Sequence, residues 1–224
     1  MTRRRRWVLL TLAVPLLLLA CSDDDGSAPT STTSSTTSST SGPTDTIAPD
    51  DPELAGLLIT ADDLPEGFAP NEEVDNTITS FCAGQDAAAG LSAEGRAITG
   101  FTRTPAGAAV IEVVFRFEGD GAAQLVTKAE DLIESCSEVP DATGLAFTYE
   151  PLSEPVAATL DGADSSTGAI GTSVGSGNLT VEIAVLQHGD LGALVAVLGV
   201  DEPQPDLDAL ASTAFTAAVA GLAA

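Results

Sequence analysis

The feature that most constrains the fold is a hydroxyl-rich stretch that cannot join a packed core. From Ser22 to about Asp50 the chain consists of Ser, Thr, Asp, Gly and Pro with almost no apolar residue. Such a segment buries too little apolar surface to offset chain entropy, so we expect a disordered tether. A folded domain must therefore come from residues 52–224, which is a normal size for a single hydrophobic core.

An apolar run precedes this tether. Residues 3–6 are all arginine, and Trp7–Ala20 is apolar apart from Thr11 and Pro15. The run is shorter than the roughly 20 residues that a relaxed membrane-spanning helix needs. A positive segment followed by such a run is typical of a signal peptide, which we expect to span residues 1–20. The arginines also leave a twin-arginine signal open.

The run ends at a cysteine with a small residue before it. Leu18-Leu19-Ala20-Cys21 looks like the lipobox of bacterial lipoproteins. In that chemistry the thiol takes a diacylglyceryl group and the peptidase requires a small residue at the cleavage site. We expect Cys21 to be the lipid attachment residue. It would anchor residues 21–51 as a tether to the outer face of the cytoplasmic membrane.

The charge of the mature chain is strongly negative. Four basic residues face 33 acidic ones, a formal net charge of −29. Such a surface repels nucleic-acid phosphates, so DNA and RNA are excluded as partners. It also lacks a polybasic segment that could bind anionic lipid headgroups, so the covalently attached lipid must provide the membrane attachment. The charge otherwise indicates either solubility in salty or alkaline surroundings or a cationic partner.

Two cysteines remain once Cys21 is lipidated. Outside the membrane, Cys82 and Cys136 meet an oxidising environment, which favours one disulfide between them. Closing a loop of about 55 residues is worth roughly 4 kcal/mol in the chain-entropy model. A buried free pair and a metal site are the alternatives, although no histidine lies near either cysteine in sequence.

Apolar periodicity predicts the elements of the domain. Period-2 patterns predict strands at residues 97–103, 108–117, 145–149, 167–174, 179–187 and 191–200. Helical spacing predicts a short helix near residue 54, a helix over 121–138 and a final helix from about Asp206. Thr60 and Asp63 fit a capping box, and Gln187-His188-Gly189-Asp190 fits a hairpin turn.

The strand at 108–117 is expected to be half-buried. Glu112 and Arg116 alternate with four apolar residues on the other face, Ile111, Val113, Phe115 and Phe117. The order of elements favours a single α+β domain in which helices pack on one face of an antiparallel sheet.

The domain resembles the extracellular sensor-like domain of mycobacterial PknH-type receptor kinases, which also occurs alone in actinobacterial lipoproteins. The matching parts are the motif Leu58-Ile-Thr-Ala-Asp-Asp-Leu-Pro-Glu-Gly-Phe68, Cys82, the strand 110–117, the helix carrying Cys136, residues 160–165, and the Gly189-Asp190 hairpin with the C-terminal helix. This resemblance covers nearly all of residues 52–224. It implies an antiparallel sheet flanked by helices, a cleft, disulfide stabilisation and ligand sensing. Family members often carry two disulfides, whereas this chain has cysteines for one, and no kinase domain accompanies it.

No catalytic constellation is evident in the sequence. His188 falls in a predicted turn without an oriented partner, and Ser173 lies in a predicted strand rather than in a nucleophile elbow. Asp161 and Asp164 offer too few ligands for a calcium loop. Asn178 begins a glycosylation sequon, which we attribute to chance. We therefore expect no enzyme activity, no metal and no cofactor.

The arginines of the domain offer one candidate anion site. Arg96, Arg103 and Arg116 fall on neighbouring predicted strands. They would bind an anion if they gathered on one face of the sheet. The alternative is local ion pairing with the abundant carboxylates.

Three functions fit these patterns. The first is a non-enzymatic, extracytoplasmic ligand-binding or sensor lipoprotein with an unknown small-molecule, cell-wall or protein ligand. The second is a carrier or chaperone for lipids or other apolar ligands in the cell envelope, which would need an apolar cavity. The third is a cell-wall hydrolase, which would need Asp161, Asp164 or His188 to converge in a deep cleft.

Overall fold

The structure is a computed structural model, and it describes residues 50–72, 80–81, 85–104, 107–136, 146–174, 179–201 and 203–224. The chain divides into two units, Met1–Gly42 and Pro43–Ala224, and every described residue belongs to the second. The predicted signal peptide, Cys21 and nearly all of the predicted tether lie outside the described residues. Within the described part of the chain, no helix is long and apolar enough to cross a bilayer.

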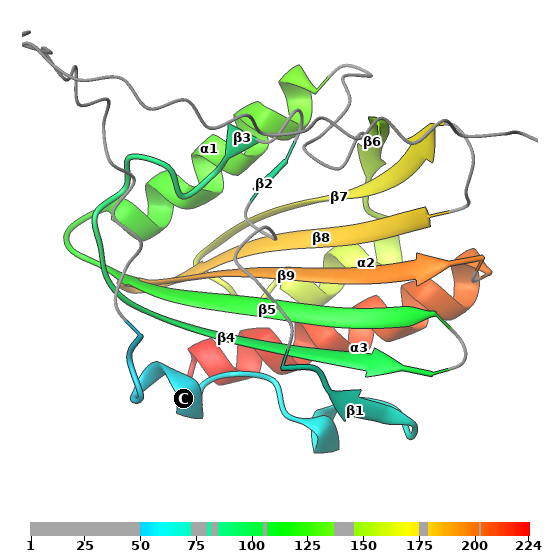
Figure 1. Cartoon of the computed structure of the whole chain (residues 1–224). Coiled ribbons are helices and arrows are strands. Elements are labelled where there is room, and N and C mark those ends of the chain that lie inside the picture. Colours follow the sequence, from blue (N-terminus) through cyan, green and yellow to red (C-terminus); the bar gives the residue numbers. More distant parts are fainter. Residues whose placement is uncertain are drawn as a thin grey trace, which may run out of the picture. The chain divides into compact units, whose positions relative to one another are not determined.

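Seven strands form one antiparallel sheet in the order β1-β4-β5-β9-β8-β7-β6 (Figure 1). The strands are β1 (Phe68–Pro70), β4 (Ala93–Arg103), β5 (Ala108–Phe117), β6 (Ala146–Pro151), β7 (Ser165–Val174), β8 (Leu179–His188) and β9 (Leu191–Val200). A separate ladder pairs β2 (Ser80–Phe81) with β3 (Gln85–Asp86). The predicted antiparallel α+β fold is confirmed. Strands β1, β2 and β3 were not predicted, because strands of two or three residues are too short to show a period.

In the described ranges, the α-helices that accompany the sheet are α1 (Gly121–Ser135), α2 (Glu154–Ala157) and α3 (Gln204–Leu222). The 3-10 turns described there are η1 (Leu54–Gly56), η2 (Ala61–Asp63) and η5 (Ala158–Leu160). The predicted capping box at η2 is confirmed, since the Asp63 carboxylate accepts both the backbone N–H and the hydroxyl of Thr60. These hydrogen bonds hold the pKa of Asp63 below its ordinary value.

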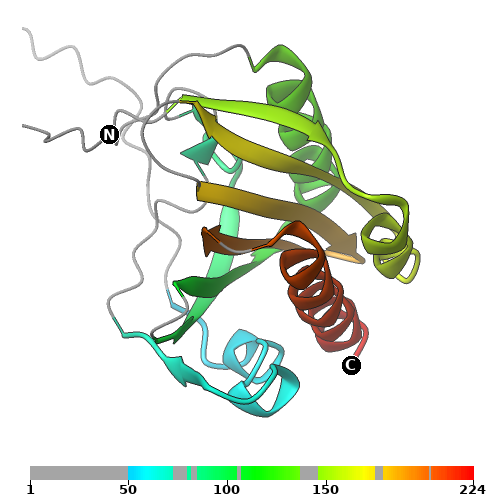
Figure 2. The same cartoon turned by 90° about the vertical axis from the view of Figure 1, so that its right-hand side faces the viewer.

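The helices cover both faces of the sheet, so the prediction that they pack on one face was wrong. In β8, Ile183 and Val185 belong to the core beneath α1, whereas Ala184 and Leu186 belong to the core beneath α3. Strands β8 and β9 contact both α1 and α3, so they lie between the two long helices (Figure 2). The physical reason is visible in β9, whose sequence is apolar at nearly every position, as expected of a strand buried on both faces.

Strand β5 is also central, and the prediction that it is half-buried was wrong. Its apolar residues Val113, Phe115 and Phe117 face α1. These residues share one face of the strand, as the alternation predicted. The opposite face contributes Val110 and Val114 to the core beneath α3. Glu112 lies between these two residues and is fully buried.

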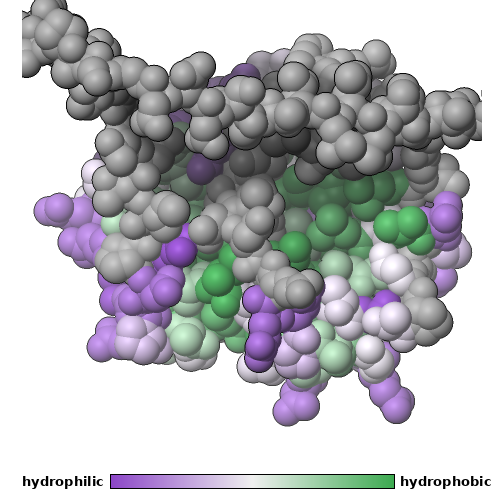
Figure 3. All heavy atoms as spheres, in the orientation of Figure 1, coloured by the Kyte–Doolittle hydropathy of each residue, from purple (hydrophilic) through white to green (hydrophobic). Residues whose placement is uncertain are grey.

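The surface seen in the view of Figure 1 is mixed in character. Apolar residues are visible in the middle and on the right, while hydrophilic residues predominate along the left and lower margins (Figure 3). Partly buried apolar residues at the margin of the α1-side core include Ile98, Leu198, Phe147 and Tyr149. Val200, at the end of β9, is half exposed.

Candidate functional site

Two carboxyl groups are buried in the layer between the sheet and α3. Glu112 on β5 and Glu182 on β8 are both 0% exposed, and they are the buried charged residues of the described chain. Both strands pair with β9, where Glu112 lies opposite Val195 and Glu182 lies opposite Val197. Because both valines belong to the core beneath α3, the two carboxyl groups point to the same face.

Glu112 connects the sheet to the segment that enters the domain, Asp50–Phe68, which we call the strap. Its Oε2 accepts the backbone N–H of Ile59 at 2.6 Å, and its Oε1 has no hydrogen-bond partner among the described residues. Burial raises the pKa of Glu112 to about 7, and the charge of Asp63 adds to the rise. The hydrogen bond from Ile59 lowers this pKa but does not outweigh burial. The group is therefore a neutral carboxylic acid under mildly acidic conditions.

Glu182 lies where β8, α3 and the start of α2 meet. The side-chain amide of Gln204 donates to Glu182 Oε1 at 3.0 Å and to Asp208 Oδ1 at 2.6 Å. Ser153, the residue before α2, donates its hydroxyl to Asp208 Oδ2 at 2.9 Å. One amide therefore bridges two carboxyl groups, while Glu182 Oε2 has no donor in the part of the chain that the structure describes. We call Glu182, Asp208, Gln204 and Ser153 the carboxyl pair site.

The pKa values of the two carboxyl groups of this site are shifted in opposite directions. Burial raises the pKa of Glu182 to about 8, and the neighbouring Asp208 carboxyl adds to the rise. Burial also works to raise the pKa of Asp208, but hydrogen bonds from Gln204, Ser153 and Glu182 outweigh it and lower that pKa. A pair with one raised and one lowered pKa holds a single proton, which resides on Glu182 at neutral pH.

Neither carboxyl group was predicted from the sequence as a site residue. The alternation of β5 placed Glu112 on a polar face, and Glu182 was given no role. The signal was a single glutamate inside an otherwise apolar stretch, Val181-Glu182-Ile183-Ala184-Val185 and Ile111-Glu112-Val113-Val114-Phe115. An acidic residue flanked by apolar residues on both sides fits the centre of a strand that is buried on both faces.

The predicted arginine anion site does not form, because the three arginines do not gather. Arg116 Nη1 lies 2.8 Å from Asp51 Oδ2 and 3.5 Å from Glu53 Oε2. Arg96 Nε lies 3.3 Å from Asp50 Oδ1. Two arginines thus hold the start of the strap, as the ion-pairing alternative predicted.

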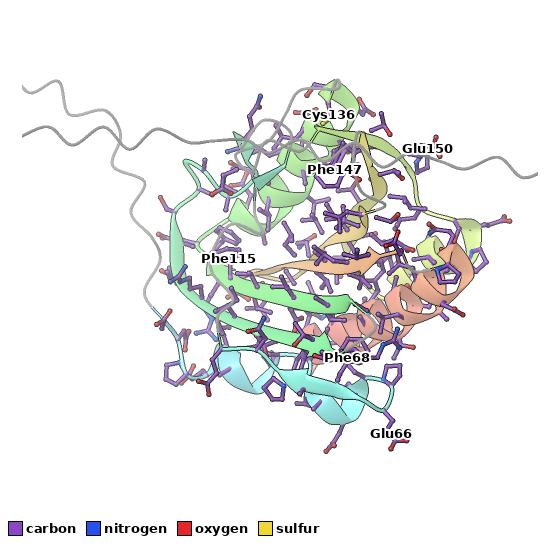
Figure 4. All side chains as sticks on the ribbon, turned by 45° about the vertical axis from the view of Figure 1, so that its right-hand side comes forward. Glu66, Phe68, Phe115, Cys136, Phe147 and Glu150 are labelled. Carbon is purple, nitrogen blue, oxygen red and sulfur yellow. The ribbon has the colours of Figure 1, made fainter. Side chains whose placement is uncertain are left out.

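Arg103 lies at the other end of β4, beside the end of the strap. Its guanidinium carbon is 5.2 Å from the centroid of the Phe68 ring, a cation–π arrangement. Glu66, close by in sequence, points away from the domain (Figure 4). The arginines therefore stabilise both ends of the strap rather than receiving an external anion.

Asp164, one of the two carboxylates with too few partners for a calcium loop, has a structural role. Asp164 Oδ2 accepts the backbone N–H of Gly189 at 2.8 Å, and its Oδ1 lies 3.7 Å from His188 Nδ1. Asp164 and His188 thus meet at the surface, where their side chains are 52% and 40% exposed, and Asp161 is also exposed. No cluster of three or more His, Cys, Asp or Glu residues occurs in the ranges that the structure describes.

The hairpin between β8 and β9 is confirmed, although it is tighter than predicted. His188 is the last residue of β8 and pairs with Leu191, so Gly189 and Asp190 alone form the turn. Gly189 has a φ of +59°, which a two-residue hairpin turn requires at this position.

Ser173 lies in β7, as predicted, and its hydroxyl oxygen accepts the backbone N–H of Leu179 at 3.2 Å. Asn178 lies outside the described residues.

Of the three cysteines, Cys136 alone belongs to the described residues. It follows the last residue of α1 and packs partly buried against the α1-side core, together with Phe147 (Figure 4). Cys82 directly follows β2, and β2 contacts α1. The Cys82–Cys136 disulfide stays a prediction.

Neither protein-family models nor curated proteins match the chain. Among solved structures, the chain is similar to the extracellular domain of PknH from Mycobacterium tuberculosis, with a TM-score of 0.52 and 15% sequence identity. The matched region covers 77% of this chain and 97% of that domain. The fold is PknH-like. At 15% identity the similarity concerns the fold alone. Of the expectations drawn from the sequence resemblance, the PknH-like arrangement of strands and helices is the one that this similarity confirms.

Proposed function

We propose that the chain is a membrane-anchored, extracytoplasmic lipoprotein whose PknH-like domain acts as a non-enzymatic ligand-binding or sensor module. The observation that carries this proposal is the fold, because nearly the whole of a known extracellular domain aligns with it. The arginine segment, the apolar run and Cys21 support export and lipid attachment. The strap supports a tethered domain, since ion pairs hold the chain where it enters the fold.

The proposal includes one disulfide between Cys82 and Cys136. It would join the residue after α1 to the residue after β2, and β2 itself contacts α1. With Cys21 lipidated, no thiol would remain for chemistry. This assignment agrees with a domain that binds rather than reacts.

Lipid labelling tests the anchor. The full chain is expressed in a bacterial host that is fed a radiolabelled or clickable fatty acid, beside Cys21→Ala. We expect the parent protein to take up label and to sediment with membranes, and Cys21→Ala to do neither. Equal labelling of both proteins would overturn the lipid assignment.

Native mass spectrometry tests the binding role. The protein is purified from its own envelope in mild detergent and measured before and after denaturation. A mass adduct that disappears on denaturation is the expected result for a binding module. A protein that carries no adduct and gains none from envelope extracts would contradict it.

A second function, carriage of lipids or other apolar molecules, is favoured by one observation. Apolar side chains at the margin of the α1-side core are only partly buried, among them Ile98, Leu198 and Tyr149. We propose this margin as the place where an apolar ligand would bind. Displacement of a fluorescent fatty acid tests it, with Leu198→Asp expected to weaken binding and the exposed Glu150→Asp as the control.

A further inference from the structure

The carboxyl pair site lies at a junction of three elements that have no cation available. No Lys, Arg or His occurs in α2, η5, α3, β7 or β9, and the histidine of β8 lies at its far end. The other acidic residues on the helices packed here, Asp206 on α3 and Glu154 on α2, are exposed. Glu182 therefore faces one titratable group at close range, the Asp208 carboxyl.

The hydrogen bonds of this site are satisfied only when it carries a proton. The amide of Gln204 supplies donors to both carboxyl groups, and the Ser153 hydroxyl supplies a third to Asp208. Among the described residues, Glu182 Oε2 has no hydrogen-bond donor. A protonated Glu182 can donate to the neighbouring Asp208 carboxyl, whereas removal of the proton leaves a buried charge without a cation beside a second carboxylate.

These hydrogen bonds connect both helices to the sheet in sequence: Gln204 joins α3 to Glu182 on β8, and Ser153 joins the residue before α2 to Asp208 on α3. Ser153 precedes α2, and Gln204 and Asp208 belong to the first two turns of α3. Loss of the proton would therefore act on the start of both helices. The rest of α3 is held by apolar packing through residues such as Ala214 and Phe215, which do not titrate.

We propose that Glu182 and Asp208 form a proton-operated switch that holds α2 and the start of α3 against β8 while protonated and releases them when the proton is lost. The switch supplies the proposed sensor module with a response to external pH, and its biological meaning rests on that function. Glu112, on the other side of β9, is the second buried carboxyl of this layer and holds the strap rather than the helices.

Hydrogen–deuterium exchange of the full chain in detergent micelles tests the switch. Protection of residues 154–160 and 204–211 is measured between pH 5 and pH 9.5 and corrected for intrinsic exchange. The variants are Glu182→Gln, which keeps the shape without the charge, and the exposed control Glu150→Gln. A proton-linked opening changes by up to about tenfold per pH unit.

In the parent protein and in Glu150→Gln, we expect protection of these segments to fall by at least about tenfold as pH rises through the titration of the site. In Glu182→Gln, protection should stay constant within about twofold. Protection that does not depend on pH in the parent protein would overturn the switch, and so would an unchanged pH response in Glu182→Gln.

A second variant keeps the test decisive if Glu182→Gln does not fold. Asp208→Asn removes the neighbouring negative charge, so the opening midpoint must move to lower pH. An unmoved midpoint contradicts the proposal. None of these measurements depends on lipid attachment or on a ligand, so failure of the switch and failure of the proposed function are told apart.

Discussion

The backbone N–H of Ile59 donates a 2.6 Å hydrogen bond to the carboxyl group of Glu112, a residue 53 positions further along the chain. Ile59 belongs to the strap, and Glu112 lies near the middle of a central strand. The bond is buried, so it connects the entry of the domain to the interior of the sheet beneath α3. This relationship makes the stability of the strap sensitive to one proton.

Replacement of Glu112 by Gln is expected to remove a pH dependence of stability. The pKa of Glu112 is raised from 4.5 to about 7, so the folded state binds the proton more tightly than the unfolded chain. Stability from this group is complete below about pH 4.5 and decreases toward pH 7, by up to about 1.4 kcal/mol per pH unit. Glu112→Gln keeps an oxygen for Ile59 and should flatten this part of the curve in urea unfolding. A slope equal to that of the parent protein would refute the assignment.

Glu112→Leu separates the charge from the hydrogen bond. The leucine side chain offers no acceptor, so the buried N–H of Ile59 is left unsatisfied. We expect a cost of about 1–3 kcal/mol in unfolding free energy at pH 5, where Glu112→Gln should remain close to the parent protein. Equal stability of the two variants at that pH would show that the hydrogen bond contributes nothing.

Gly221→Ala tests the contact between α3 and the strap. A Cβ atom at Gly221 would overlap the backbone carbonyl oxygen of Leu57, which cannot move as freely as a side chain. We expect a loss of about 1–3 kcal/mol, as for other overpacked positions, together with faster proteolysis near the strap. Gly56→Ala is the matched control, because an added Cβ there meets nothing within 4 Å. Similar effects at both positions would argue against the contact.

The ion pair of Arg116 with Asp51 is expected to contribute modestly. Both side chains are partly exposed, at 30% and 18%, and such pairs are worth about 0.2–1 kcal/mol. Asp51→Asn should lower stability by that amount at low salt and by less at high salt, measured by thermal unfolding. A salt-independent effect would point to the hydrogen bond that Asp51 Oδ1 accepts from the backbone N–H of Glu53 instead of the ion pair.

Removal of the proposed disulfide is expected to destabilise the domain. Cys136→Ser, or reduction of the parent protein, should lower the unfolding free energy by about 2–4 kcal/mol. Thiol titration of the unreduced, unfolded protein should detect neither Cys82 nor Cys136. Two reactive thiols and a stability that does not change with reductant would contradict the pairing.

Local sequence patterns predicted those elements whose apolar spacing or turn residues lie within a single segment of the chain. The apolar spacing of α1 predicted its start at Gly121, and the Gly189-Asp190 pair predicted the hairpin of β8 and β9. Helix α1 ends at Ser135 rather than at residue 138. Periodicity therefore located the long strands and helices within a few residues, because the apolar repeat runs through the length of each element.

What the sequence determined by itself is which residues share a face of each strand, since this depends only on the alternation of side chains. Only the tertiary structure decided what covers each face. Alternation put Glu112 opposite the apolar residues of β5, and the packing of α3 and the strap turned that position into an interior one. The carboxyl pair site likewise joins Glu182 to Asp208 on a helix that follows in the chain. Coverage arises from contacts between distant segments, so no local pattern specifies it.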